Sequence, residues 1–243
     1  MGPRGDRATE VLASGAAEFG VKLNDRQLDQ FDKFTALLLE WNSKFNLTRI
    51  TDPAEIAVKH YLDSLSLLAV AHVPADSTVI DVGTGAGFPA VPLKIALPDL
   101  TITMLDSVRK KLAFLETAVR ELGLSNVELA HGRAEDLARR ETHRERFDFA
   151  VSRAVAKLAV LVELCMPFCR IGGTFAAYKG PGADEEVKAA GKAIDTLGGE
   201  LGAIHRLTLP HSDLERTLVI VKKSRPTPPR FARKAGVPQR NPL

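Results

Sequence analysis

The chain has 243 residues, of which 45% are hydrophobic, so it can form one α/β domain with an additional element and a substantial core. It opens Met-Gly-Pro-Arg without the apolar run of a secretory signal peptide, and no stretch approaches the roughly 20 apolar residues of a membrane helix. This composition excludes wholesale disorder, and we expect a cytoplasmic protein with no membrane association.

Charge is distributed unevenly along the chain, although the formal net charge is only +3. From Lys222 onward there are seven Lys or Arg residues and no acid, so the preceding part of the chain carries a net charge of −4. A basic segment on an acidic body is found in nucleic-acid-binding proteins, because phosphates attract it. A solvated, disordered end would have the same composition, and the charge alone leaves both interpretations open.

Cys165 and Cys169 are the only cysteines, and no histidine lies near them in the sequence. The pair therefore lacks the ligands of a metal site, and we expect two small buried residues on one helix. We predict that the protein uses no metal.

Helical patterns fill residues 1–75, which we interpret as an N-terminal helical extension. Asn24 is a suitable N-cap for a helix whose apolar residues recur every three or four positions from Leu28 to Phe45. Asp52-Pro53-Ala54-Glu55 supplies an N-cap, a proline in the first turn and a capping glutamate for a second helix, which carries Ile56 to Leu68.

Strands and helices alternate between residues 76 and 223, which we interpret as the main domain. Strands are predicted over residues 78–82, 100–105, 127–130, 147–151 and 174–178, and helices over residues 89–96, 107–122, 158–168 and 184–197. This alternation predicts parallel βαβ units and a doubly wound, Rossmann-like α/β sheet. Two late strands, near residues 203–209 and 217–221, have no helix between them and predict an antiparallel strand at the edge. Residues 224–243 form a basic tail rich in Pro and Arg.

A glycine-rich loop follows the first strand, in the run Asp81-Val82-Gly83-Thr84-Gly85-Ala86-Gly87-Phe88-Pro89. Glycines between a strand and a helix let a ligand approach the backbone closely. A nicotinamide dinucleotide site expects the longer G-x-G-x-x-G spacing, and Asp81 would repel its pyrophosphate. The acid suits a ligand with a cationic end, such as the sulfonium and ammonium groups of S-adenosylmethionine. We therefore favour a methyl-donor site and keep dinucleotide binding as the alternative.

Two further segments at strand ends extend the expected donor site. Asp106 closes the second strand, where a carboxylate can accept both ribose hydroxyls, although a surface acid that caps the next helix would look the same. After the third strand, the Ala134 amide and the carboxylate of Glu135 or Asp136 can recognise an adenine. Doubly wound sheets bind ligands at the carboxyl ends of their strands, so these loops should meet in one site.

The segment after the fourth strand reads Ser152-Arg153-Ala154-Val155-Ala156 and lacks the polar-Pro-Pro-aromatic turn of enzymes that methylate exocyclic amines. This absence argues against adenine N6 and cytosine N4 as targets. Guanine N7 has a free lone pair and needs no general base, so its methylation would depend on positioning and desolvation. Cations such as Arg153 and Lys179 should hold a phosphate, the guanine O6 or the donor carboxylate rather than point at N7.

Together these motifs resemble one family, the bacterial 16S rRNA guanine-N7 methyltransferases, historically called glucose-inhibited division protein B or methyltransferase G. The glycine loop is generic to the superfamily, whereas His60-Tyr61-Leu62-Asp63-Ser64-Leu65, Ser152-Arg153-Ala154 and Arg233-Lys234-Ala235-Gly236-Val237-Pro238 are specific to the family. The resemblance runs from residue 20 to the end. One departure is the charged segment 139–146, which is longer than in the family pattern and whose role is therefore open.

The resemblance implies a class I, S-adenosylmethionine-dependent methyltransferase that modifies a guanine N7 in the 530 loop of 16S rRNA (position 527). It implies donor contacts at Gly83, Phe88, Ala134, Glu135 and Arg153, which join Asp81, Gly85, Gly87 and Asp106 in the expected donor site. Arg133 and Lys179 match basic positions that would face the RNA or the target base, and are the candidate catalytic-site residues. The implied partner is 16S rRNA or a small ribosomal subunit particle, and we expect a monomer.

Three functions stay open on the sequence. The first is the rRNA methyltransferase, with the N-terminal helices and the basic tail gripping RNA. The second is a methyltransferase of another RNA, a protein or a small molecule, and the third is a non-catalytic donor-binding protein. Because the body is acidic, the RNA substrate rests mainly on the resemblance. His60 and Asp63 can equally be structural residues that join the N-terminal helices to the domain.

Overall fold

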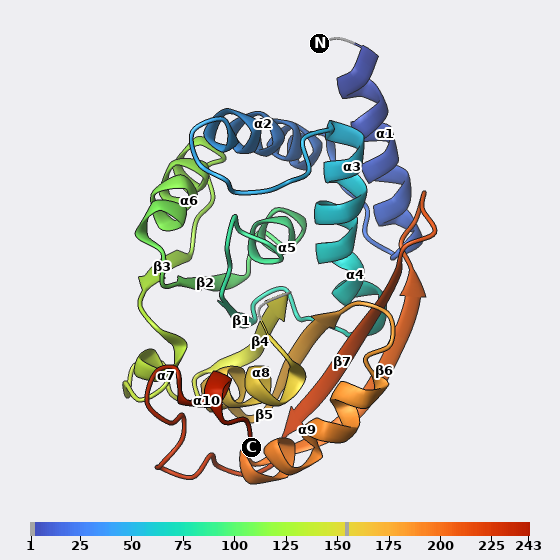
Figure 1. Cartoon of the computed structure of the whole chain (residues 1–243). Helices are drawn as coiled ribbons and strands as arrows, with labels where there is room; N and C mark the ends of the chain where they lie inside the picture. Colours follow the sequence, from blue (N-terminus) through green and yellow to red (C-terminus); the bar gives the residue numbers. More distant parts are fainter. Residues whose placement is uncertain (1–2, 154–155) are drawn as a thin grey trace.

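The computed structural model describes residues 3–153 and 156–243 and consists of a central sheet between two layers of helices (Figure 1). One core cluster joins the sheet to the N-terminal helices and includes Leu12, Phe34, Tyr61 and Phe114. A second cluster lies on the opposite face and includes Phe168. Among the described residues, no helix has the length and apolar character needed to cross a membrane.

The sheet has seven strands in the order β3-β2-β1-β4-β5-β7-β6. Its strands are β1 Thr78–Val82, β2 Thr101–Asp106, β3 Val127–His131, β4 Phe147–Arg153, β5 Cys169–Lys179, β6 Gly199–Thr208 and β7 Glu215–Lys223. β1 to β5 pair in parallel, which confirms the doubly wound sheet. β7 is antiparallel to both β5 and β6. The reversed strand thus lies one position inside the edge, because the β6–β7 hairpin folds its second strand onto β5.

Helices cover the two faces of this sheet as the sequence pattern predicts. The first face carries α1 Pro3–Glu18, α2 Asp25–Asn42, α3 Pro53–Ile56, α4 Asp63–Val70, α5 Ala90–Ala96 and α6 Arg109–Glu121. The second carries α7 Ala134–Leu137, α8 Leu158–Cys165, α9 Asp184–Thr196 and α10 Val237–Arg240. The predicted N-caps are confirmed: Asn24 forms a capping box with Gln27, and Asp52 accepts from the Glu55 amide. Each satisfies amide groups that the first helical turn leaves without partners.

The helix predicted to begin after Asp52 is interrupted, which the sequence did not predict. Between α3 and α4, residues Ala57–Leu62 form a π-helical segment, η1. A π turn holds one more residue than an α turn and so rotates the side chains that follow it. His60 lies in this segment, and Asp63 follows it directly. Apolar periodicity does not reveal such a segment, because α3, η1 and α4 all keep their apolar side chains on the core.

Two local predictions are wrong. The helix predicted over residues 107–122 does not begin with a cap at Ser107; instead Asp106 Oδ1 accepts from the Val108 amide, and the helix begins at Arg109. Cys165 and Cys169 do not share a helix, because a 3₁₀ turn containing Pro167 separates α8 from β5. Both thiols are buried, as expected, and burial raises the pKa of Cys169 to about 12.

Residues 224–243, the C-terminal segment, pack against α7 and α8 instead of extending from the domain (Figure 1). Phe231 and Ala232 are buried in the second core cluster. Arg139 donates twice to the Ala232 carbonyl, and Arg144 donates to the carbonyls of Thr227 and Phe231. The charged segment 139–146 therefore anchors the C-terminal segment, which gives this departure from the family pattern a structural role.

Candidate functional site

A pocket of about 440 Å³ opens at the carboxyl ends of β1 to β4, and we call it the edge pocket. This is where a doubly wound sheet binds ligands, since the loops that follow the parallel strands meet there. Its lining comes from all three predicted loops, from the end of β4 and from four further segments, which contribute Leu47, His60, Leu164 and Gln239. The residues are Leu47, His60, Val82, Gly83, Thr84, Gly85, Ala86, Phe88, Leu105, Asp106, Ser107, Val108, Lys111, Gly132, Arg133, Ala134, Glu135, Arg153, Leu164 and Gln239.

The glycine loop folds back onto the end of β2. The amides of Gly83 and Thr84 both donate to the Leu105 carbonyl, and the Gly85 amide donates to Asp106 Oδ2 at 3.0 Å. Gly85 has a φ of 61°, and a Cβ there would meet only the Gly83 carbonyl oxygen, at 4.0 Å. The backbone at Gly85 is therefore open to a ligand in the edge pocket.

Gly87 serves a different purpose from the one the sequence suggested. It does not line the edge pocket, and its φ of 89° favours glycine. A Cβ at this position would lie 2.6 Å from Val91 and 2.8 Å from Leu115, so the glycine lets the loop pack against α5 and α6. Gly87 is needed to fold the loop, not to admit a ligand.

Asp106 combines the two interpretations that the sequence left open. Its side chain is only 6% exposed, and it lines the edge pocket at the end of β2. Oδ1 accepts from the Val108 amide at 2.8 Å, while Oδ2 accepts from Gly85 and from Lys111 Nζ, the latter at 3.4 Å. One carboxylate thus joins the glycine loop to the start of α6 and still faces the pocket.

Asp81 lies beneath the glycine loop rather than on the pocket surface. The residue is fully buried, and its Oδ2 accepts from the Ala90 amide at 3.2 Å. Among the described residues, Oδ1 of Asp81 and Oγ1 of Thr84 are buried and have no hydrogen-bond partner in good geometry, although the Thr84 hydroxyl is near enough to stabilise the Asp81 carboxylate. Burial raises the pKa of the Asp81 carboxyl to about 7, against the opposing effects of the Thr84 hydroxyl, the Ala90 amide and Arg153. Two buried oxygens without partners next to a pocket are typical of a binding site that has a polar ligand to receive.

The end of β3 contributes Arg133, Ala134 and Glu135 to the lining, as predicted, whereas Asp136 is exposed outside the pocket. Glu135 Oε1 accepts from the Gly236 amide at 2.9 Å, which ties the C-terminal segment to the pocket. Gln239, the third residue of α10, consequently forms part of the lining. No periodic or chemical pattern in the sequence indicated Gln239, although the neighbouring ending resembled the family pattern.

On the other side, the edge pocket has a stacked cluster of Phe88, His60 and Arg153. The His60 ring stacks on Phe88 with centroids 4.4 Å apart, and the Arg153 guanidinium carbon lies 5.0 Å from the Phe88 ring centroid. His60 Nδ1 accepts from Arg153 Nη2 at 3.3 Å, so Nε2 carries the proton that it shares with Thr48 Oγ1 at 2.8 Å. Burial and the Arg153 charge lower the pKa of His60 to about 3. The imidazole is therefore a neutral part of the pocket wall at physiological pH.

A neutral His60 predicts a specific dependence of stability on pH. Below pH about 6.5 the unfolded chain binds a proton at this histidine, and the folded protein does not until pH about 3, so stability falls as the pH decreases through this window. The free energy of unfolding should therefore fall with decreasing pH less steeply in the His60→Gln variant than in the parent protein. Below pH 6 we expect the two slopes to differ by about 1.4 kcal/mol per pH unit. Urea titrations at pH 7.5, 6 and 5 measure the two slopes, and equal slopes would contradict the assignment.

Lys179 does not reach the edge pocket. Its Nζ pairs with Glu186 at 2.8 Å and donates to the Ala156 carbonyl at 2.9 Å. Of the family motif Ser152-Arg153-Ala154, the first two residues lie at the end of β4, while Ala154 lies outside the described residues. Of the two candidate catalytic-site residues, Arg133 and Lys179, only Arg133 lines the edge pocket, where it is exposed.

Most basic residues of the C-terminal region are engaged within the protein. Lys223 is buried and pairs with Glu145, Arg225 pairs with Asp195, and Arg233 pairs with buried Glu163. Lys222 donates to Thr174. Lys222 and Arg225 are exposed in spite of these contacts, and Arg230, Lys234 and Arg240 are also exposed. The charge excess of the sequence therefore overstates what this region can offer to RNA.

Comparison with known proteins identifies the family to which this arrangement belongs. The family model GidB, described as rRNA small subunit methyltransferase G, matches residues 27–217. The chain belongs to the GidB family. Among curated relatives, ribosomal RNA small subunit methyltransferase G of Desulforamulus reducens is 46% identical, with 97% of this chain and 98% of the relative covered. The protein of the same name from Alkaliphilus metalliredigens is also 46% identical, over 96% and 98% of the two chains. The resemblance found in the sequence is thus confirmed, and this GidB family member is a methyltransferase.

Solved structures agree with this assignment at the level of the fold. Fibrillarin of Aeropyrum pernix, solved with natively bound S-adenosyl-L-methionine, is 16% identical with a TM-score of 0.51, covering 66% of this chain and 73% of that one. TrmN of Thermus thermophilus is 17% identical with a TM-score of 0.51, covering 66% and 48%. The Rossmann-like fold of class I methyltransferases is therefore confirmed.

Proposed function

We propose that the protein transfers the methyl group of S-adenosylmethionine to N7 of a guanine in the 530 loop of 16S rRNA. The observation that carries the proposal is the near full-length similarity to proteins named ribosomal RNA small subunit methyltransferase G. The chemistry of the edge pocket supports it independently. We further propose that the protein acts as a monomer in the cytoplasm and requires no metal.

The edge pocket fits S-adenosylmethionine in size and in its polar groups. Its volume falls in the usual range of roughly 300–1,000 Å³ for small-molecule sites. Asp106 would accept the ribose hydroxyls, and Ala134 with Glu135 would recognise the adenine. The open backbone at Gly85, with Gly83 beside it in the lining, would lie against the donor. Thr84 Oγ1 and the Asp81 carboxyl would provide polar groups near its cationic end. Arg153 would bind the donor carboxylate.

The donor supplies an electrophilic methyl group, and the protein supplies position and a dry environment. Guanine N7 attacks through its own lone pair, so no side chain has to remove a proton first. The purine ring becomes cationic on methylation, and a neutral His60 adds no opposing charge at the pocket wall. Leu47, Phe88 and Leu164 form an apolar part of the lining, which would help to exclude water around the reacting atoms. Arg133 would position the substrate. Lys179, which lies outside the edge pocket, would act only indirectly, by holding Glu186 at the start of α8.

The RNA would approach over the basic residues at the mouth of the edge pocket. Lys111 and Arg133 line it, and Arg109 and Lys110 are exposed on the first turn of α6. Lys110 Nζ lies 5.3 Å from the centroid of the Phe45 ring, so the α2–α3 connection joins this surface. Phosphates would bind these cations and set the register of the RNA, whereas the pocket would select the base.

The decisive experiment maps N7-methylguanine in small-subunit rRNA from cells with and without the protein, by reduction and strand cleavage at the modified base. We expect one cleavage site in the 530 loop to disappear without the protein and to return with the wild-type gene, but not with Asp106→Ala. An unchanged pattern would reject the rRNA substrate and direct the search to other RNAs, proteins and small molecules. Donor binding without any methyl transfer would favour a regulatory protein.

Donor binding should release a proton near neutral pH. Asp81 has a pKa of about 7 in the donor-free protein, and a cationic ligand nearby would favour its charged form. Calorimetry at pH 6.5 in two buffers of different ionisation enthalpy should therefore give different binding heats for S-adenosylmethionine. The difference should be smaller for S-adenosylhomocysteine, which lacks the sulfonium, and absent in Asp81→Asn. Identical heats in both buffers for the wild-type protein would show that Asp81 does not respond to the donor.

A further inference from the structure

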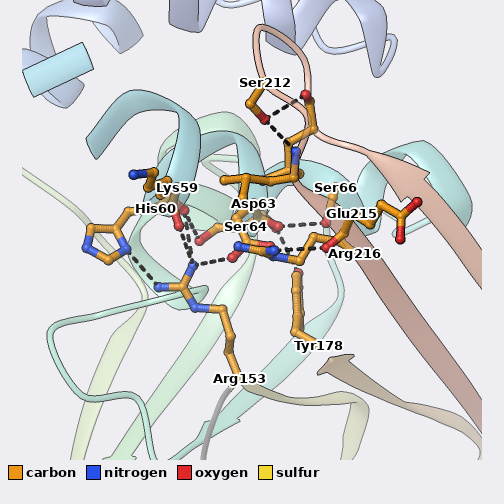
Figure 2. A network of polar contacts seen from close by, with 12 residues as sticks. Lys59, His60, Asp63, Ser64, Ser66, Arg153, Tyr178, Ser212, Glu215 and Arg216 are labelled. Carbon is orange, nitrogen blue, oxygen red and sulfur yellow. Dashed lines mark hydrogen bonds and ion pairs between the residues drawn. The ribbon is translucent and has the colours of Figure 1, made fainter. Parts of the chain in front are cut away.

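Asp63 is a buried carboxylate that binds two arginines, one with each oxygen. Oδ2 accepts from Arg153 Nη1 at 3.1 Å, and Oδ1 accepts from Arg216 Nε at 3.0 Å. The Asp63 side chain is 6% exposed, and Arg153 is 13% exposed. Figure 2 shows Asp63 between the two guanidinium groups, with Arg153 reaching on toward His60. Asp63 itself does not line the edge pocket, whereas Arg153 does.

The contacts of Arg153 fix its guanidinium on several sides. Beyond Asp63, it donates to His60 Nδ1 and, at 3.4 Å each, to the carbonyls of Lys59 and His60 in the π-helical segment. One face lies toward the Phe88 ring. Asp63 is the one carboxylate that pairs with it among the described residues. A long, charged side chain at the end of a strand needs such a partner, because ordering it costs up to about 2 kcal/mol of conformational entropy.

Asp63 is in turn held rigidly by its surroundings. The hydroxyl group of Tyr178, on β5, donates to the Ser64 carbonyl at 2.7 Å, and Ser66 Oγ donates to the Asp63 carbonyl at 2.6 Å. Arg216, on β7, donates to the carboxylate oxygen that Arg153 does not bind (Figure 2). Contacts from β4, β5 and β7 therefore converge on the start of α4. The N-terminal helices and the sheet meet at this carboxylate, and its position is set before any ligand arrives.

We propose that Asp63 is a positioning residue for donor binding, which orients Arg153 toward the edge pocket without touching the donor. The inference rests on the proposed donor site. Oδ1 and Arg216 hold the carboxylate in place, so that Oδ2 presents the Arg153 guanidinium in one orientation. Substitution of Asp63 then weakens donor binding only through Arg153, and its effect disappears once Arg153 is changed.

A double-mutant cycle tests this dependence. The isosteric Asp63→Asn variant keeps the volume but replaces one acceptor oxygen with an amide donor that faces an arginine. We expect Asp63→Asn and Arg153→Lys each to raise the Kd of S-adenosylhomocysteine about tenfold in calorimetry, and the double variant to be no weaker than Arg153→Lys alone. If the two effects multiply to about a hundredfold, Asp63 does not act through Arg153 and the proposal is overturned.

Asp148→Asn is the matched control, because Asp148 also holds an arginine, Arg170, but lies at the amino end of the sheet near Thr78. It should change thermal stability and leave the Kd within about twofold. If Asp63→Asn does not fold, Asp63→Glu, which keeps the charge but moves the carboxylate, takes its place in the same cycle. The cycle measures ligand binding alone. If the protein methylates no rRNA, the proposed function is rejected, but the cycle still shows whether Asp63 acts through Arg153.

Discussion

The Asp106→Ala variant should lose donor affinity by about 100-fold or more. The carboxylate holds the Gly85 amide with one oxygen and the Val108 amide with the other, so its removal frees both the glycine loop and the start of α6. Asp106 would also accept the two ribose hydroxyls of the donor. Since hydrogen bonds to a charged group contribute about 1.5–3 kcal/mol each, the loss of these two corresponds to at least two orders of magnitude in Kd. Calorimetry with S-adenosylmethionine measures the effect.

Asp136→Ala is the control for this prediction. Asp136 is another acid after a strand end, and the sequence left it as an alternative to Glu135 for adenine recognition, but it is exposed and outside the edge pocket. Its removal should leave the Kd within about twofold, as for most surface substitutions. Equal losses in the two variants would mean that the negative charge of this edge, and not the bonding of Asp106, supports the donor.

The Arg233→Ala variant should be the most destabilised of the single substitutions in the C-terminal segment. Arg233 donates to both oxygens of Glu163, at 2.8 and 3.1 Å from Nε, and to the Asn241 carbonyl. The Glu163 side chain is 1% exposed, so the variant would leave a buried carboxylate without its cation. Breaking a buried pair in this way costs about 3–5 kcal/mol, and Tm should fall by about 6–20 °C.

Arg225→Ala provides the comparison within the same segment. Arg225 pairs with Asp195 across the surface, where the two side chains are 56% and 79% exposed. Such pairs contribute about 0–1 kcal/mol, so Tm should fall by at most a few degrees. Similar Tm values for Arg225→Ala and Arg233→Ala would contradict a buried anchor at Glu163. Donor affinity should weaken only in Arg233→Ala, since Gln239 lies in the part of the segment that this arginine holds.

The order of the elements could be predicted from the sequence because it depends on local patterns. Apolar periodicity, the caps at Asn24 and Asp52, and the positive φ of Gly123 after α6 are all properties of short stretches. The π-helical segment could not be predicted, since an added residue in one turn leaves the apolar stripe intact. The place of β7 inside the edge also could not be predicted, because two antiparallel strands pair equally well in either order.

The candidate site could be predicted where a motif and a strand end coincide. Gly83, Gly85, Phe88, Asp106, Arg133, Ala134, Glu135 and Arg153 all line the edge pocket. Asp81, Gly87 and Lys179 do not, because the loop turns Asp81 under itself, Gly87 packs on α5 and α6, and Glu186 holds Lys179 away. Leu47, His60 and Gln239 were missed as pocket residues. They come from segments far away in the sequence, and only the tertiary fold brings them to the pocket.

The contact between Glu135 and Gly236 also affects how the protein folds, because it joins residues 101 positions apart. Contacts of such separation require a large loop to close, and they form after the local structure in the folding of most domains. A chain whose sheet has already formed would therefore still lack the side of the pocket that contains Gln239. Donor binding should develop only after this contact has closed, and its appearance in a stopped-flow experiment would report docking of the C-terminal segment rather than formation of the glycine loop.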